Sequence, residues 1–143
     1  MSLKNTHLGW QNEHLARYLL SKVAFITSPT MPGDDVGVDL VCTLYDLERS
    51  DKSAPVLVPK NAIAVQVKST RKVWDFTKKV PYLQRLEIPF FVAVVMQNDL
   101  SLDLYSAKYL SHLFSFRGSP KKLKFHPVDD LTSHYREGND MAG

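Results

Sequence analysis

The first hydrophobic pattern along the chain is typical of an amphipathic helix. Between residues 7 and 21, apolar side chains recur at roughly helical spacing with polar residues between them, namely Leu8, Leu15, Leu19 and Leu20. Thr6 stands directly before this segment and can cap its first turn. The sequence therefore predicts one helix over residues 7–21.

The next segments have the alternating or continuous apolar pattern of β-strands. Ala62–Lys68 is apolar on both sides, which predicts a strand at the centre of its sheet. The predicted strands are 23–26, 36–47, 62–68 and 88–96, with short ones at 102–105 and 121–125. A turn rich in proline, glycine and aspartate is expected at 29–35, and an exposed, charged connection at 48–60.

Two more helices are predicted in the second half of the chain. Residues 74–86 carry apolar residues at helical spacing, and Pro81 fits there only if the regular helix starts near Thr77. Ser106 can cap another helix that runs to about Phe114.

The order of the main elements is α-β-β-β-α-β. Three successive strands can form a meander, and the helix between the third and fourth strands provides the crossover that parallel neighbours need. We therefore expect a mixed sheet in a single domain over residues 1–143, with its core at about 7–96 and a C-terminal extension at 97–143. The polar tail beyond Ser133 is expected to fray.

Composition narrows the classes of function. The 143 residues and 44% hydrophobic content suit one buried core. The net charge of +3 and pI of about 9.0 permit a polyanionic partner without requiring one. Cys42 is the only cysteine, which excludes an intrachain disulfide and predicts a buried, inert thiol. The N-terminus lacks the apolar region of a signal peptide and residues 88–96 are too short to cross a bilayer, so we expect a cytoplasmic protein without membrane contact.

Chemistry-bearing residues gather on two of the predicted strands. Asp39 lies in an otherwise apolar strand, and Gln66 and Lys68 lie near the end of the next one. Residues two apart on a strand point to the same face, so Gln66 and Lys68 project together. If the two strands pair, Asp39 lies beside them, and an acid, an amide and an ammonium group meet at one end of the sheet.

This grouping suits the hydrolysis of phosphodiesters. Mg²⁺ takes oxygen ligands and needs only one or two protein carboxylates. Asp39 would be the anionic ligand, with the Gln66 amide oxygen and the Val67 carbonyl as neutral ligands. Lys68 would orient the attacking water or stabilise charge on the phosphate. Glu13, on the first helix, could complete the metal shell directly or through water.

The chain resembles the PD-(D/E)xK nuclease superfamily, which includes restriction endonucleases and archaeal Holliday-junction resolvases. GVDLVCTLYD followed by AIAVQVKST is particularly similar to uncharacterised bacterial members with a QxK motif, and the resemblance covers about residues 7–96. It implies a restriction-endonuclease-like α/β fold, an α-β-β-β-α-β core with a central mixed sheet flanked by helices. It also implies a Mg²⁺- or Mn²⁺-dependent DNA endonuclease with the catalytic residues Glu13, Asp39, Gln66 and Lys68, the first three as metal ligands.

Two positions depart from the pattern of that superfamily. Val38 replaces the signature proline, which is not a ligand, and Gln66 replaces an acidic residue. A neutral amide attracts a divalent cation less strongly than a carboxylate does. The alternative is therefore a catalytically weak or inactive module of the same fold that binds nucleic acid or a protein partner.

Structural roles also stay open for these residues. Asp39 and Lys68 could form a salt bridge at the edge of the sheet, Gln66 could be a satisfied core amide, and Glu13 could lie on a solvated face. A homodimer is expected if both strands of a duplex are cut.

Overall fold

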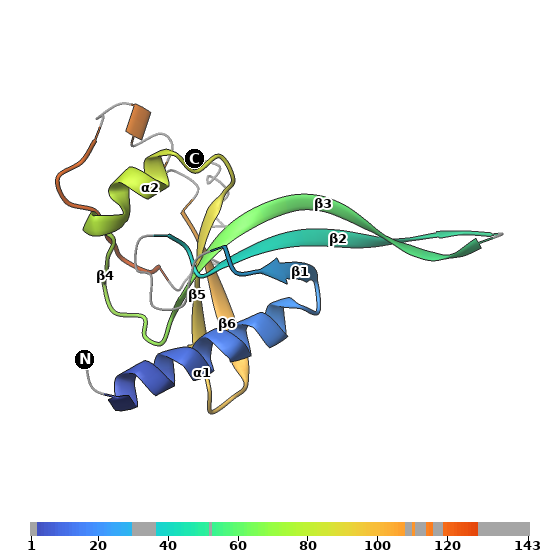
Figure 1. The fold of residues 1–143 in the computed structure, drawn as a ribbon, viewed down its shortest axis with the longest axis horizontal. Coiled ribbons are helices and arrows are strands. Elements are labelled where there is room, and N and C mark those ends of the chain that lie inside the picture. Colours follow the sequence, from blue (N-terminus) through green and yellow to red (C-terminus); the bar gives the residue numbers. More distant parts are fainter. Residues whose placement is uncertain are drawn as a thin grey trace.

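A mixed five-stranded sheet is the centre of the fold in the computed structural model (Figure 1), which describes residues 3–29, 37–51, 53–107, 110, 114–115 and 119–128. Its strands lie in the order β1-β2-β3-β5-β6, and their bounds are β1 Ala24–Thr27, β2 Leu40–Ser50, β3 Ser53–Lys68, β5 Phe90–Met96 and β6 Ser101–Ser106. Only β3 and β5 pair in parallel; the other neighbours are antiparallel. The predicted meander and the mixed sheet are confirmed.

The helix α1, Leu3–Leu20, covers one face of the sheet (Figure 1). Ala16 and Leu20 of α1 are buried there against Cys42, Val65 and other residues of that face. Burial raises the pKa of the Cys42 thiol to about 11, as expected for an inert cysteine. None of the described helices is both long and apolar enough to cross a membrane.

The opposite face is covered by short elements from the middle and end of the chain. The single turn η1, Thr77–Lys79, leads into α2, Val80–Gln84, and β4, Trp74–Asp75, pairs with β7, Lys124–Phe125. Phe76 is the largest fully buried side chain of the described core, with its ring edge-on to Phe90 and Phe125 at centroid distances of 5.7 and 5.1 Å. Burial of one such side chain stabilises the fold by about 1.5–3 kcal/mol.

Successive side chains of the central strands point to opposite sides of the sheet. Both sides are buried because α1 covers one face and the short elements around α2 cover the other. Val65 of β3 packs on the α1 side, and Ala64 packs with Val92 and Val94 on the α2 side. This arrangement explains the continuous apolar runs in β3 and β5 and fixes the face on which Gln66 and Lys68 project.

Most of the described residues of the predicted connection at 48–60 are exposed as expected, but the prediction of a connection without strands is wrong. Those residues lie mostly in β2 and β3, which extend as a two-stranded arm beyond the sheet (Figure 1). Leu47 pairs with Leu57 across the arm, and Glu48 forms an ion pair with Lys60 at 3.1 Å. Leu47 and Leu57 are 51% and 44% exposed, so these strands have no buried face and the sequence there looks like a polar loop.

The helix predicted at 74–86 is shorter than expected. Trp74 and Asp75 form β4, the chain turns helical only at Thr77, and Pro81 lies in the first turn of α2, where a proline is tolerated. The Asp75 carboxylate accepts the Thr77 N–H at 2.9 Å, which starts the helical turn after the strand.

The C-terminal expectations were met only in part. Ser106 ends β6 and is not a helix cap, although Leu110 and residues 114–115 are helical. The strand predicted at 121–125 is limited to Lys124–Phe125.

The strand predicted at 36–47 begins at Leu40. Most of the predicted turn at 29–35 and the tail beyond Ser133 lie outside the described residues.

The hydrogen-bonding sides of the arm follow from its register. The Ala64 N–H donates to the Pro89 carbonyl at 2.8 Å, so the even-numbered residues at this end of β3 face β5. Between the pairs Thr43–Ala62 and Tyr45–Pro59, β3 contains one residue more than β2, and this bulge reverses the alternation. Pro59 therefore has its nitrogen on the outer edge of the arm, where no donor is needed.

The same register predicts alternating hydrogen-exchange protection in the arm. The Tyr45 N–H donates to the Val23 carbonyl at 3.4 Å, away from β3, so the odd-numbered residues that follow on β2 also face outward. Slow exchange is expected at Asp46, Glu48, Val56 and Val58, and fast exchange at Leu47, Arg49 and Leu57. Amide exchange measured by NMR tests this, and equal protection at Asp46 and Leu47 would contradict the register.

Candidate functional site

Asp39 stands directly before β2 and is bound to β3. Its backbone N–H donates to the Val65 carbonyl at 3.1 Å. Its carboxylate oxygen Oδ2 accepts two hydrogen bonds, from the Gln66 Nε2 at 3.0 Å and from the Val67 backbone N–H at 2.8 Å. The sequence-based expectation that Asp39 lies beside Gln66 is confirmed, although Asp39 precedes the strand instead of lying within it.

The end of β3 explains why a carboxylate is needed here. The pairing of β2 with β3 runs only to Leu40 and Val65, whereas β5 pairs with β3 as far as Lys68. Beyond Val65, therefore, β3 has a neighbouring strand on only one side. The Val67 N–H points to the open side, and the Asp39 carboxylate takes the place of the missing strand.

Gln66 is almost completely buried, with 8% of its surface exposed. Its Nε2 donates to Asp39, while its Oε1 is buried and has no hydrogen-bond partner within the described part of the chain. A buried acceptor without a partner costs about 1–3 kcal/mol, so this oxygen is a strong candidate to bind a cation or a water molecule.

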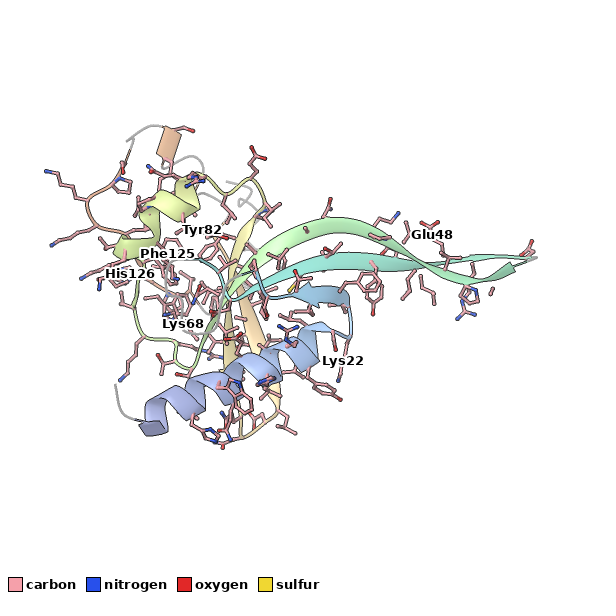
Figure 2. The ribbon with its side chains drawn as sticks, in the orientation of Figure 1. Lys22, Glu48, Lys68, Tyr82, Phe125 and His126 are labelled. Atoms are coloured by element: carbon pink, nitrogen blue, oxygen red, sulfur yellow. The ribbon has the colours of Figure 1, made fainter. Side chains whose placement is uncertain are left out.

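Lys68 lies at the end of β3 (Figure 2), and its spacing of two residues from Gln66 on that strand puts both side chains on the same face. Its ammonium Nζ is 5.3 Å from the centre of the Phe76 ring, in a cation–π contact. Because Phe76 is itself buried, the lysine stem is held against the α2 side of the sheet. The ammonium group is therefore positioned near the candidate site by an aromatic ring.

Lys79 is a residue of this region that the sequence did not indicate. It is buried in η1, and its Nζ donates to the Gly37 carbonyl at 2.7 Å. This hydrogen bond anchors the segment that leads into Asp39. Nothing in the Lys78-Lys79 pair distinguishes the buried lysine from the exposed one, because its partner is 42 residues away in the chain.

Glu13 approaches the site from α1. The helix is anchored near this position by a hydrogen bond from the Gln97 Nε2 to the Asn12 Oδ1 at 2.6 Å. Burial raises the pKa of the Glu13 carboxyl above its ordinary value of 4.5, and the charge of Asp39 raises it further, while Arg17 and His14 act in the opposite direction. The structure thus brings Glu13 close enough to Asp39 for the two carboxylates to repel each other.

These groups offer oxygen ligands suited to a hard divalent cation. The charges of Glu13 and Asp39 repel each other, and the Gln66 Oε1 has no hydrogen-bond partner among the described residues; a divalent cation bound to these groups would relieve both costs. Among the described residues, no group of three or more His, Cys, Asp or Glu side chains could hold a metal. The side chains that could offer oxygen ligands to a cation here are Asp39, Glu13 and Gln66.

The raised pKa of Glu13 predicts a pH-dependent stability. Because the folded-state pKa lies above the ordinary 4.5, the folded protein binds the proton more tightly, and stability falls as the pH rises through the window between these two values. Glu13→Gln removes the titrating group. Urea unfolding from pH 4 to 7 should show this variant gaining stability relative to the wild type as the pH rises. A constant difference across that range would contradict the assignment.

Comparisons of the chain with protein-family models, with curated proteins and with solved structures find no match. What the molecule does must therefore be inferred from the geometry of Asp39, Gln66, Lys68 and Glu13.

Proposed function

We propose that this protein is a metal-dependent nuclease that hydrolyses DNA phosphodiester bonds. The observation that carries the proposal is the Asp39 carboxylate, which is hydrogen-bonded to the strand end that bears Gln66 and Lys68 and whose charge acts on Glu13. The order α-β-β-β-α-β and the parallel β3–β5 pair support a restriction-endonuclease-like core. The proposal is further supported by Asp39 directly before β2 and by Gln66 and Lys68 at the end of β3.

The ligands of the proposed Mg²⁺ or Mn²⁺ ion are Asp39, the Gln66 Oε1 and Glu13, with the Val67 carbonyl as a fourth. That carbonyl belongs to the same side of β3 as the Val67 N–H, which faces Asp39. When bound, the ion supplies Lewis-acid stabilisation of the phosphate and lowers the pKa of a bound water.

Lys68 has a separate role in the proposed reaction. Its ammonium group, held by the Phe76 ring, donates hydrogen bonds to the attacking water or to a phosphate oxygen. Phe76 thereby positions the lysine, because the contact restricts the side chain before the substrate arrives. Lys79 holds the Gly37 carbonyl and so keeps Asp39 in place.

The Gln66 amide favours a second candidate, a module of this fold with little or no catalytic activity. Its Nε2 already supplies a hydrogen bond to Asp39, a stabilisation that a cation would otherwise provide. A site satisfied in this way can exist without metal and can serve to bind nucleic acid or a protein. Metal binding and DNA binding therefore have to be measured separately.

Cleavage of plasmid and branched DNA with Mg²⁺ or Mn²⁺ tests the nuclease proposal. Lys68→Ala should lower the rate by about a hundred-fold or more, because it removes the proposed donor to the water or phosphate, and Asp39→Ala should abolish cleavage, because it removes the proposed main metal ligand. Matched controls away from the site and the arm are Arg85→Ala and Glu87→Ala, at two exposed charged residues, which should cleave like the wild type. Urea unfolding verifies that each variant is folded. Activity that survives both site substitutions would refute the proposal.

Gln66→Glu separates the two candidates. A third carboxylate should tighten Mn²⁺ binding, measured by calorimetry, because it adds negative charge beside Asp39 and Glu13. Without metal, the same variant should be less stable than the wild type, because two carboxylates then repel each other. If neither protein binds Mn²⁺ at millimolar concentration, the module is favoured. DNA binding with a steep salt dependence would then identify nucleic acid as its partner.

We propose DNA as the substrate, the cytoplasm as the compartment and a homodimer as the active form. A duplex has two strands to cut, and the arm exposes Leu47, Val56 and Leu57, apolar side chains that a second subunit could cover. The buried, unpaired Cys42 is consistent with a reducing compartment.

A further inference from the structure

The outward face of α1 carries a line of aromatic rings. His7, Trp10, His14 and Tyr18 recur at intervals of three and four residues, which places them along one side of the helix. Trp10 and Tyr18 are 59% and 62% exposed. The rings of His7 and Trp10 lie within 24° of parallel, with centroids 6.0 Å apart, and the His14 ring contacts Trp10 edge-on at 4.2 Å.

Packing of the fold does not explain this line of rings. The helix binds the sheet through its other side, where Asn12, Ala16 and Leu20 are buried. The second tryptophan shows the ordinary behaviour of the residue type: Trp74 is 5% exposed and its indole N–H donates to the Thr70 carbonyl at 2.9 Å. Trp10 instead presents its ring to solvent.

The tryptophan lies on the flank of α1 that faces the candidate site. Trp10, Glu13 and Arg17 are spaced three and four residues apart and therefore share that flank. The Glu13 carboxylate is close enough to Asp39 to be affected by its charge. A group stacked on Trp10 would consequently lie beside the carboxylates that are proposed to hold the metal.

The charge of this helix suits a polyanion. Between His7 and Lys22 the only acidic residue is Glu13, which belongs to the proposed metal site. Arg17 and Lys22 provide positive charge; Lys22, at the C-terminal end of α1 (Figure 2), lies over the Tyr18 ring with its Nζ 5.4 Å from the centroid. A nucleic acid combines flat rings with negative charge and therefore complements this face.

We propose that the aromatic face of α1 stacks the unpaired bases of a nucleic acid next to the scissile phosphate. In a duplex the faces of the bases are already covered by their neighbours, so a surface ring can stack only on a base in a single strand, at a frayed end or at a branch. The inference rests on the proposed nuclease function and deepens it: the substrate is single-stranded or branched DNA.

Tryptophan fluorescence tests this directly, because Trp10 is exposed and Trp74 is buried. With EDTA present to prevent cleavage, a 20-nucleotide oligo(dT) should quench the emission, and a blunt duplex of equal length should quench it far less. Trp10→Phe should abolish most of the quenching yet retain most of the affinity, since a ring remains. Trp10→Ala should weaken binding of a labelled oligo(dT), measured by anisotropy, by about ten-fold or more.

Leu8→Ala is the matched control, because Leu8 is exposed on the other flank of α1 and its replacement should leave binding unchanged. Unchanged affinity of Trp10→Ala, or equal quenching by the duplex, would overturn the inference. Cleavage that persists with an unaltered KM in Trp10→Ala would overturn it while leaving the nuclease proposal intact. Quenching by oligo(dT) in a protein that never cleaves DNA would support base stacking and refute only the nuclease.

Discussion

The backbone of β3 needs hydrogen-bond partners on both of its sides as it crosses the core. The candidate site lies where the partner on one side changes from a neighbouring strand to a side chain. Along most of its length β3 is bordered by β2, and β5 joins it on the other side from Ala64 onward. At Val67 the strand β2 has ended, and a side-chain carboxylate takes over. The same contact that completes the sheet thus fixes Asp39 beside Gln66, so the stability of the fold and the geometry of the site cannot be separated.

Gln66 places a neutral amide, and not a second carboxylate, next to Asp39. An acid at this position would put a further negative charge against Asp39, and the pair would require a cation to coexist at neutral pH. The amide instead donates a hydrogen bond through Nε2 and leaves its buried oxygen without a partner within the described residues. With glutamine at position 66, folding leaves one hydrogen-bond acceptor without a partner among those residues. This costs less free energy than the repulsion between two buried carboxylates.

The parts of the fold that bury apolar surface were predictable from the sequence. β3 within the core and β5 are continuous apolar runs because both of their faces are covered, and the polar residues Gln66 and Lys68 stand out against that background. The outer part of the arm buries neither face, so its sequence has no hydrophobic periodicity from which the strands could be predicted. The contact of Lys79 with Gly37 could not be predicted either, because it depends on a fold that brings η1 next to the segment before β2, 42 residues away in the chain.

Pro59 limits how the arm can associate with other chains. Its ring nitrogen interrupts the outer edge of β3, while the outer edge of β2 beyond Tyr45 contains no proline before Ser50. Two arms that each have one edge open to pairing can join through those edges in a two-fold symmetric dimer. No open edge is then left for a third chain. Growth of a fibre needs two complementary edges on every molecule, and an arm of this kind supplies only one.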